Sequence, residues 1–324
     1  MRDRQAHGER REKGAALIVV LLLVATLSFI LLSITNVVTS AVKRSAADRA
    51  RTDFYWRAAA GEQIAKQILE KYLEAPPPKM ALGEGIFAKA IEVPIEGGKA
   101  SIEFRDATLC FNINSLVTAG AQGYDANPAT IPSFVNMLTA IGLGEGEARK
   151  ISDVIVDYID NDSLSQGQGA EDGFYSALPT PFRTGSQLLS SISELRALDG
   201  MSRGRFSRIS PYLCAHPTTA PGKVNINMAS DAHAPILLAL QPAGSTASLT
   251  DIKAALGALP PGGLSNVSAL TPPLAGITEY VVTSDRVEAK ITLEVNDRTI
   301  EEKLLFDIST PPVRLLARTF GDDY

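Results

Sequence analysis

Residues 14–42 read GAALIVVLLLVATLSFILLSITNVVTSAV, a run without a charged side chain. It exceeds the roughly 20 apolar residues that an α-helix needs to cross a bilayer. A secretory signal has a shorter apolar region, usually of about 7–15 residues. The run therefore predicts a membrane-spanning helix. Basic residues lie on both sides of it, so charge bias alone barely decides its orientation.

The helical pattern continues beyond this run. Small and apolar residues recur there at spacings of three and four, which is typical of one face of a helix; they are Ala58, Gly61, Ala65, Ile68, Leu69 and Tyr72. The three prolines at 76–78 end the pattern, because proline lacks the amide proton and clashes with the preceding turn. We expect one helix of about 60 residues, apolar in its first half and amphipathic in its second.

Composition narrows the class of protein. The length of 324 residues permits two domains. The net charge of −5 argues against a general nucleic-acid binder, which would show a basic face. The two cysteines, Cys110 and Cys214, are too few for a cysteine-rich zinc module or an iron–sulfur centre. They permit one disulfide if the compartment is oxidising.

The rest of the chain divides into three stretches. Residues 80–119 predict strands, since KASIEFRDA (99–107) alternates apolar and polar positions. Residues 120–215 change to a helical periodicity with glycines between the segments. From 216 to 324 strands return, in ITEYVVTSD (277–285), VEAKITLEV (287–295) and RTIEEKLLFDI (298–308), the last two joined by a tight turn at Asn296–Asp297. A short helix is expected at 249–259.

These stretches predict an α+β fold: a long N-terminal helix, an antiparallel sheet and a large inserted α-helical domain. We expect CFNIN (110–114) and KVNIN (223–227) to be the strands of the sheet that flank the insertion.

Two segments of the insertion, 141–159 and 195–213, resemble helix–hairpin–helix sequences. In DNA-binding versions the turn presents backbone amides to phosphate. Residues 120–215 hold eleven acidic and seven basic side chains, a balance that disfavours a polyanion. We expect these hairpins to be packing units and predict no nucleic-acid partner.

An acidic loop, DYIDNDSLSQGQGAED (157–172), has five carboxylates and no basic residue: Asp157, Asp160, Asp162, Glu171 and Asp172. Such loops supply the oxygen ligands of hard cations, and this one has no histidine or thiolate for zinc. Calcium is the cofactor we predict. The loop does not match an EF-hand, and Gly167 and Gly169 suggest that it bends back on itself. The alternative is a solvated acidic loop without a metal.

No catalytic motif is present. The histidines are His7, His216 and His233, none in an H-E-x-x-H motif, and neither G-x-S-x-G nor a Walker A sequence occurs. We expect His216 and His233 to be solvated or capping side chains and predict that the protein is not an enzyme.

Several motifs together carry a family resemblance. REKGAALIVVLLL (11–23) resembles a type IV prepilin leader, which prepilin peptidase would cut between Gly14 and Ala15. The ordered set FNIN, VDYIDND, GAEDGFY, SELRALDGM and KVNIN resembles the type II secretion minor pseudopilin K family over nearly the whole chain. Val19 would be the fifth mature residue, where pilins usually have glutamate, and the K family lacks that glutamate.

The resemblance implies a type IV pilin-like fold with these parts: a leader at 1–14, a transmembrane and stalk helix at 15–74, pilin sheet at 80–119 and 216–324, and the inserted domain at 120–215. It also implies calcium in the inserted domain, N-methylation of Ala15, and a single-pass inner-membrane protein whose C-terminal domain lies in the periplasm.

The implied function is that of a pseudopilus tip subunit, which promotes pseudopilus assembly and the export of folded proteins across the outer membrane. Its implied partners are the I, J and H types of minor pseudopilin and prepilin peptidase. The alternative is a membrane-anchored periplasmic protein that binds a ligand or substrate through its helical domain.

Cys110 and Cys214 each lie near one boundary of the inserted domain. A disulfide between them would staple the chain where it leaves the sheet and where it returns. The alternative is a pair of buried free thiols.

The leader makes the first testable prediction. The chain should lose residues 1–14, and replacing Gly14 with a bulky residue should block the cut, because the peptidase pocket must accept a residue without a side chain. Intact-mass measurement of protein from membranes checks this. Precursor mass in cells that contain the peptidase would contradict it.

Overall fold

The computed structural model describes residues 2–121, 123–242, 245–295 and 298–320. The chain divides into two compact units, residues 1–60 and 61–324. The α-helices within the described residues are α1 (Arg2–Glu74), α2 (Ile131–Ala140), α3 (Glu145–Ile159), α4 (Asp172–Ser176), α5 (Arg203–Ile209), α6 (Ala234–Ala239) and α7 (Leu249–Gly257). The strands are β1 (Ile91–Ile95), β2 (Gly98–Asp106), β3 (Phe111–Asn112), β4 (Val117–Gly120), β5 (Gly123–Ala126), β6 (Leu213–Cys214), β7 (Val224–Asn225), β8 (Tyr280–Val281), β9 (Arg286–Val295), β10 (Arg298–Asp307) and β11 (Arg314–Phe320).

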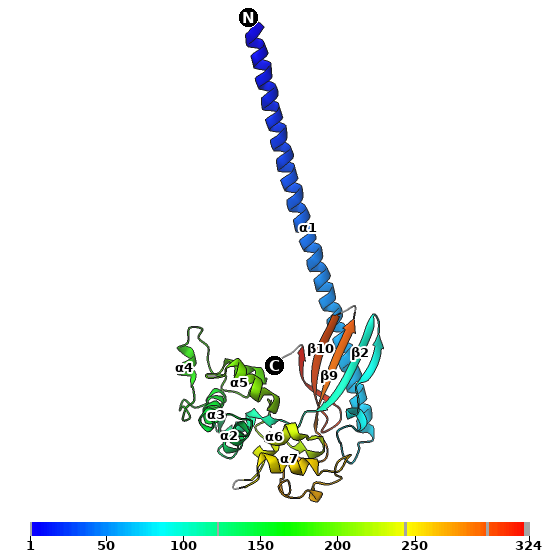
Figure 1. The fold of residues 1–324 in the computed structure, drawn as a ribbon, viewed down its shortest axis with the longest axis vertical. Coiled ribbons are helices and arrows are strands. Elements are labelled where there is room, and N and C mark those ends of the chain that lie inside the picture. The colour runs from blue at the N-terminus through cyan, green and yellow to red at the C-terminus, as the bar shows by residue number, and fades with distance from the viewer. Residues whose placement is uncertain (1, 122, 243–244, 296–297, 321–324) are drawn as a thin grey trace. The chain divides into compact units, whose positions relative to one another are not determined.

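Helix α1 is the long helix that the sequence predicts (Figure 1). Its apolar side chains from Leu17 to Val42 are exposed. Among the described residues it is the one helix that is long and apolar enough to cross a membrane. It ends at Glu74, just before the prolines at 76–78. The predicted stop is confirmed.

The last turns of α1 pack against the sheet. Ala65 and Leu69 are fully buried. A Cβ atom at Gly61 would lie 3.1 Å from Ile291 Cδ1 on β9, so the missing side chain lets the helix lie close to the strand. The small and apolar spacing in this part of the sequence thus marks the face that contacts the sheet.

Within the described part of the chain the sheet has five strands in the order β1-β2-β9-β10-β11, and every neighbouring pair is antiparallel. Buried side chains alternate along β9 at positions 287, 289, 291, 293 and 295, as expected for a strand with one covered face. Strand β2 pairs with β9 from Asp106↔Val287 to Gly98↔Val295. The expected turn at Asn296–Asp297 lies outside the described residues.

Residues 107–285 therefore form an insertion between two neighbouring strands. The expectation that CFNIN and KVNIN belong to the sheet is wrong. Strand β3 instead pairs in parallel with β6, and β7 in parallel with β8, in two small separate sheets. Strands β3 and β7 are only two residues long, because the chain turns after each of them into a 3₁₀ helix, at Ile113–Leu116 and at Ile226–Met228.

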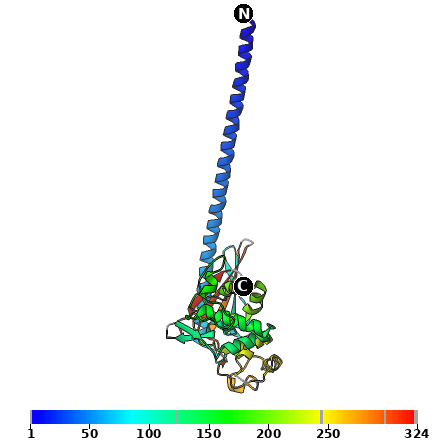
Figure 2. The same cartoon turned by 90° about the vertical axis from the view of Figure 1, so that its left-hand side faces the viewer.

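Helices α2, α3, α4, α5 and α6 of the insertion contribute to one apolar core. Helices α2 and α3 form the first predicted hairpin, with Gly142 at φ 93° in the turn. The 3₁₀ helix Ile192–Ala197 and α5 form the second, with Gly200 at φ 73°. Figure 2, which looks from the helical side, shows these helices in front of the sheet.

Three basic side chains of the two hairpins have acidic partners among the described residues. Arg205 pairs with Glu147, and Lys150 Nζ lies 2.8 Å from Asp199 Oδ2, so both pairs join one hairpin to the other. Arg149 pairs with Glu145 within α3. These contacts support the interpretation of the hairpins as packing units.

The helical part extends beyond the expected boundary at residue 215. Residues 216–285 hold α6 where we expected sheet, and β8 has only two residues. Ile236 and Ala239 of α6 join the core of the hairpins. The segment lacks the alternating pattern of a half-buried strand, and burial of this apolar helix face decides its structure. The helix expected at 249–259 is present as α7.

A buried carboxylate lies between α1 and the sheet. Glu302 on β10 is 0% exposed. Arg318 on β11 has its Nε 3.3 Å from Glu302 Oε1 and also pairs with Glu62 of α1. One guanidinium thus serves two carboxylates, and burial raises the pKa of Glu302 to about 7.

Glu302 predicts a pH-dependent stability. Between its ordinary pKa of 4.5 and about 7, the unfolded chain ionises while the folded chain keeps the proton, so stability falls as pH rises. The loss reaches up to about 3 kcal/mol. Glu302→Gln should remove this loss. Thermal unfolding of the portion from about residue 43, measured from pH 4 to pH 8, checks it.

Glu301→Gln is the matched control, since Glu301 lies next in sequence but pairs with Lys290 at 2.8 Å. That variant should keep the decline. Parallel pH curves for the original chain and Glu302→Gln would show that Glu302 is not responsible.

Candidate functional site

The acidic loop is folded back over the end of α3. Asp157, in the last turn of α3, is fully buried. Its Oδ1 accepts a hydrogen bond from Gln166 N and its Oδ2 one from Ser165 Oγ, both at 2.9 Å. A Cβ atom at Gly169 would lie 2.0 Å from Asp157 Oδ2, so only glycine leaves room for this approach. The loop bends as its glycines suggest.

Three carboxylates of this loop lie close together. One oxygen each of Asp160, Asp162 and Glu171 lies within 4.8 Å of the others. Asp160 is 1% exposed, and neither of its carboxylate oxygens has a hydrogen-bond partner among the described residues. Burial, with the charges of Asp162 and Glu171, raises the pKa of Asp160 to about 7. The cluster is a set of oxygen donors that no cation of the chain neutralises within the described residues.

The structure separates the five predicted ligands into two groups. Asp160, Asp162 and Glu171 come together, whereas Asp157 holds the loop and Asp172 begins α4. Asp172 Oδ1 accepts a hydrogen bond from Thr184 N at 3.2 Å, and Oδ2 lies 3.7 Å from Arg183 Nη1.

Asp125 is a carboxylate near the cluster that the sequence did not predict as part of it. Asp125 of β5 raises the pKa of Asp160 through its charge, after burial and the nearer carboxylates. Nothing in the local sequence links it to the loop. The link is tertiary, since Asn161 Oδ1 accepts a hydrogen bond from Tyr124 N at 2.6 Å.

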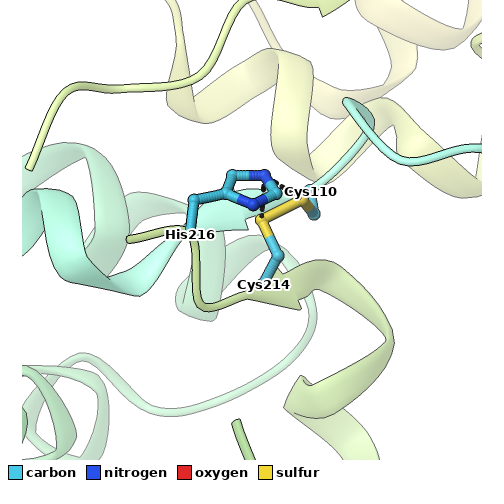
Figure 3. Close-up of side chains that lie close together, drawn as sticks. All are labelled: Cys110, Cys214 and His216. Atoms are coloured by element: carbon cyan, nitrogen blue, oxygen red, sulfur yellow. Dashed lines mark hydrogen bonds between the residues drawn. A yellow bond between two sulfur atoms is a disulfide. The ribbon is translucent and has the colours of Figure 1, made fainter. Parts of the chain in front are cut away.

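A second cluster lies where β3 meets β6. Asn112 is paired with Cys214, and a disulfide joins Cys214 to Cys110, with the Cα atoms 5.6 Å apart. Figure 3 shows His216 beside this disulfide, with Nε2 3.2 Å from Cys214 Sγ and 3.6 Å from Cys110 Sγ.

The expectation of a solvated or capping role is wrong for His216, which is 3% exposed. Its backbone N donates to Asn112 Oδ1 at 3.0 Å, and its backbone O accepts from Asn114 Nδ2 at 2.8 Å. Burial, and then the charge of Arg286, lower the pKa of His216 to about 4, so the imidazole is neutral at neutral pH. His233 does cap, accepting from Ser230 N at 3.1 Å.

The chain is similar to known proteins over a stretch that contains the residues of both clusters. The family described as "Type II secretion system (T2SS), protein K" matches residues 109–218. Type II secretion system protein K of Pectobacterium carotovorum is 32% identical over 326 aligned positions, which cover 96% of this chain and 97% of that protein. The chain belongs to the type II secretion system protein K family. The protein K of Aeromonas hydrophila is 29% identical and covers 94% of the chain and 92% of its own length.

A solved structure has the same fold. It is the GspK–GspI–GspJ complex from enterotoxigenic Escherichia coli, one chain of which superposes with a TM-score of 0.73 at 24% identity, covering 86% of this chain and all of that one. The predicted α+β, pilin-like class is confirmed, with a long N-terminal apolar helix, an antiparallel sheet and several helices.

The disulfide makes a prediction about stability. It closes a loop across a sequence separation of 104, which is worth about 4–5 kcal/mol in the chain-entropy model and often less in practice. The double variant Cys110→Ser, Cys214→Ser should lose up to that amount in denaturant unfolding.

Alkylation provides the direct check. Unreduced, unfolded chain should react at no thiol, and reduced chain at two. Labelling of both cysteines without reduction would contradict the bond.

Proposed function

We propose that the protein is a minor pseudopilin at the tip of the type II secretion pseudopilus, where it promotes assembly and the export of folded proteins across the outer membrane. The full-length similarity to protein K of Pectobacterium carotovorum carries the proposal, since it includes the apolar helix, the sheet and the insertion. In this role the protein is not an enzyme but a rigid structural subunit.

Val19 supports the proposed position at the tip, together with the family similarity. This residue replaces the glutamate that, in pilin-like filaments, is thought to pair with the N-terminal amine of a neighbouring subunit. A carboxylate in hydrocarbon is costly unless it is paired. A subunit with no neighbour above it has no partner for that charge, so valine suits the tip. Val19 lies in the exposed apolar part of α1.

The proposed setting is the inner membrane. Helix α1 anchors the chain once, after prepilin peptidase removes residues 1–14, and the unit from residue 61 onward lies in the periplasm. The proposed partners are the I, J and H types of minor pseudopilin. The similar solved chain comes from a complex with GspI and GspJ, which supports the first two.

Co-purification tests the assignment. The tagged full-length chain should retain the I- and J-type pseudopilins of the same organism as a discrete complex when all three are co-expressed. Val19→Glu should keep this complex but reduce pseudopilus formation, since it adds an unpaired carboxylate to the membrane helix. A chain that stays monomeric in the presence of both partners would favour the alternative, a membrane-anchored ligand-binding protein.

We also propose that Asp160, Asp162 and Glu171 bind calcium. The buried, unpartnered oxygens of Asp160 fit a cation, and three carboxylates fit a hard one. Calcium takes six to eight oxygens, so waters or backbone carbonyls complete its shell. The ion neutralises like charges held close together, and Asp157 and Asp172 keep the ends of the loop in place. A bound ion would give the insertion the rigidity that a docking cap needs.

Calcium binding predicts a stability that depends on the free ion. It adds RT ln(1 + [Ca²⁺]/Kd), about 2.7 kcal/mol at one hundred times Kd. A chelator should lower the melting temperature of the portion from about residue 43. The double variant Asp160→Ala, Asp162→Ala should lose the calcium-dependent shift and keep its fold.

Glu145→Ala is the matched control, because this exposed carboxylate on α3 pairs only with Arg149 in the ion pairs described and should leave the shift intact. An unchanged melting temperature with chelator, together with no metal by elemental analysis, would show a solvated loop. The assignment to the tip would survive that result.

A further inference from the structure

The second cluster has the ligand types of a thiophilic metal ion. Two sulfur atoms and the imidazole Nε2 of His216 lie within 4.8 Å of one another. Thiolate and imidazole together are the donors that zinc prefers, and calcium does not use them. The acidic cluster described above holds oxygen donors only, so the two clusters select different ions.

We propose that Cys110, Cys214 and His216 bind one Zn²⁺ ion when the disulfide is reduced, with a water in the fourth position.

The distances support this geometry. A tetrahedral zinc ion with bonds of about 2.3 Å to sulfur and about 2.0 Å to nitrogen separates these two donors by about 3.5 Å. His216 Nε2 already lies 3.2 Å and 3.6 Å from the two sulfur atoms. Only the sulfur atoms must separate, to about 3.8 Å, as an ion replaces the bond between them. Rotation of two cysteine side chains is enough for that.

The elements that carry the ligands are held by more than the disulfide. The pairing of β3 with β6 places Asn112 opposite Cys214. The side chain of Asn112 also donates to the backbone oxygens of Thr218 and Ala220, at 2.7 Å and 3.1 Å, and accepts from His216 N. These hydrogen bonds remain after reduction, so the reduced chain keeps the three ligands together.

The redox step balances with an external dithiol as the reductant. A dithiol reductant passes two electrons and two protons to the disulfide, leaves two thiols and becomes a cyclic disulfide itself. Zn²⁺ then displaces the two thiol protons. The two thiolates and the ion add no net charge beside Arg286, the charged residue that acts on His216. A small-molecule disulfide as oxidant accepts two electrons from the thiolates and two protons from water, leaves as two thiols, and so restores the protein disulfide and releases the ion. The segments that carry Cys110 and Cys214 are thus cross-linked in both redox states, by the disulfide or by the ion.

The test uses the full-length chain in detergent with excess Ca²⁺, so that the carboxylates are occupied. The chain is reduced with a dithiol, freed of it without oxygen, and titrated with Co²⁺ as a spectroscopic substitute for zinc. One equivalent should produce sulfur-to-cobalt charge-transfer absorption and the visible bands of a tetrahedral site, and Zn²⁺ should remove both. Oxidised chain and the variant Cys110→Ser, Cys214→Ser should show neither.

The variant His216→Ala tests whether the metal is bound by three ligands or by the two thiolates alone. It should weaken the metal affinity at least about 10-fold, whereas His233→Ala, the matched control outside the cluster, should leave it unchanged. X-ray absorption of the zinc-loaded original chain should find two sulfur neighbours and one imidazole nitrogen, whether or not the variant folds. Absence of the charge-transfer band, equal affinity in His216→Ala, or a shell without imidazole would overturn the proposal.

Discussion

The pairing of β2 with β9 is the constraint on which the remaining structure depends. The two strands are neighbours in one sheet although residues 107–285 lie between them. Neighbouring strands lie about 4.8 Å apart, so the insertion must leave and return at nearly one place. The point of exit is fixed by side chains: Ser284 donates to Asp106 and accepts from Asn225 Nδ2. Burial raises the pKa of Asp106, and four hydrogen bonds to its carboxylate oppose that shift.

The same local structure occurs twice inside the insertion. Asn112 and Asn225 are each the second residue of a two-residue strand. The side-chain oxygen of each accepts a hydrogen bond from the backbone N two residues later. Their amide groups donate to distant backbone oxygens, those of Thr218 and Ala220 for Asn112 and that of Met80 for Asn225. Strands of two residues leave many buried backbone groups without a ladder partner, and these asparagines supply the partners instead. The disulfide and His216 lie beside the first of them.

Two buried carboxylates, those of Glu302 and Asp160, have different electrostatic surroundings. Glu302 has Arg318 nearby, a cation that the chain itself supplies. Asp160 has no such cation in the part of the chain that is described, only further carboxylates. An unpaired buried carboxylate costs several kcal/mol unless it is protonated or meets a cation. This difference is why Glu302 and Arg318 belong to the stability of the fold, whereas the carboxylates around Asp160 point to an ion from solution.

The sequence by itself determined the features that depend on neighbouring residues: the apolar helix and its proline stop, the alternating strands, the hairpins with their glycine turns, and the bend at Gly169. The sequence also contains the motifs on which the family resemblance rests. Tertiary structure decided what depends on distant residues. Strand β3 pairs with β6 about a hundred residues later, which buries His216 and brings Cys110 to Cys214. Local sequence could not divide the five carboxylates of the loop either, because hydrogen bonds to Asp157 and the burial of Asp160 arise only when the loop folds over α3.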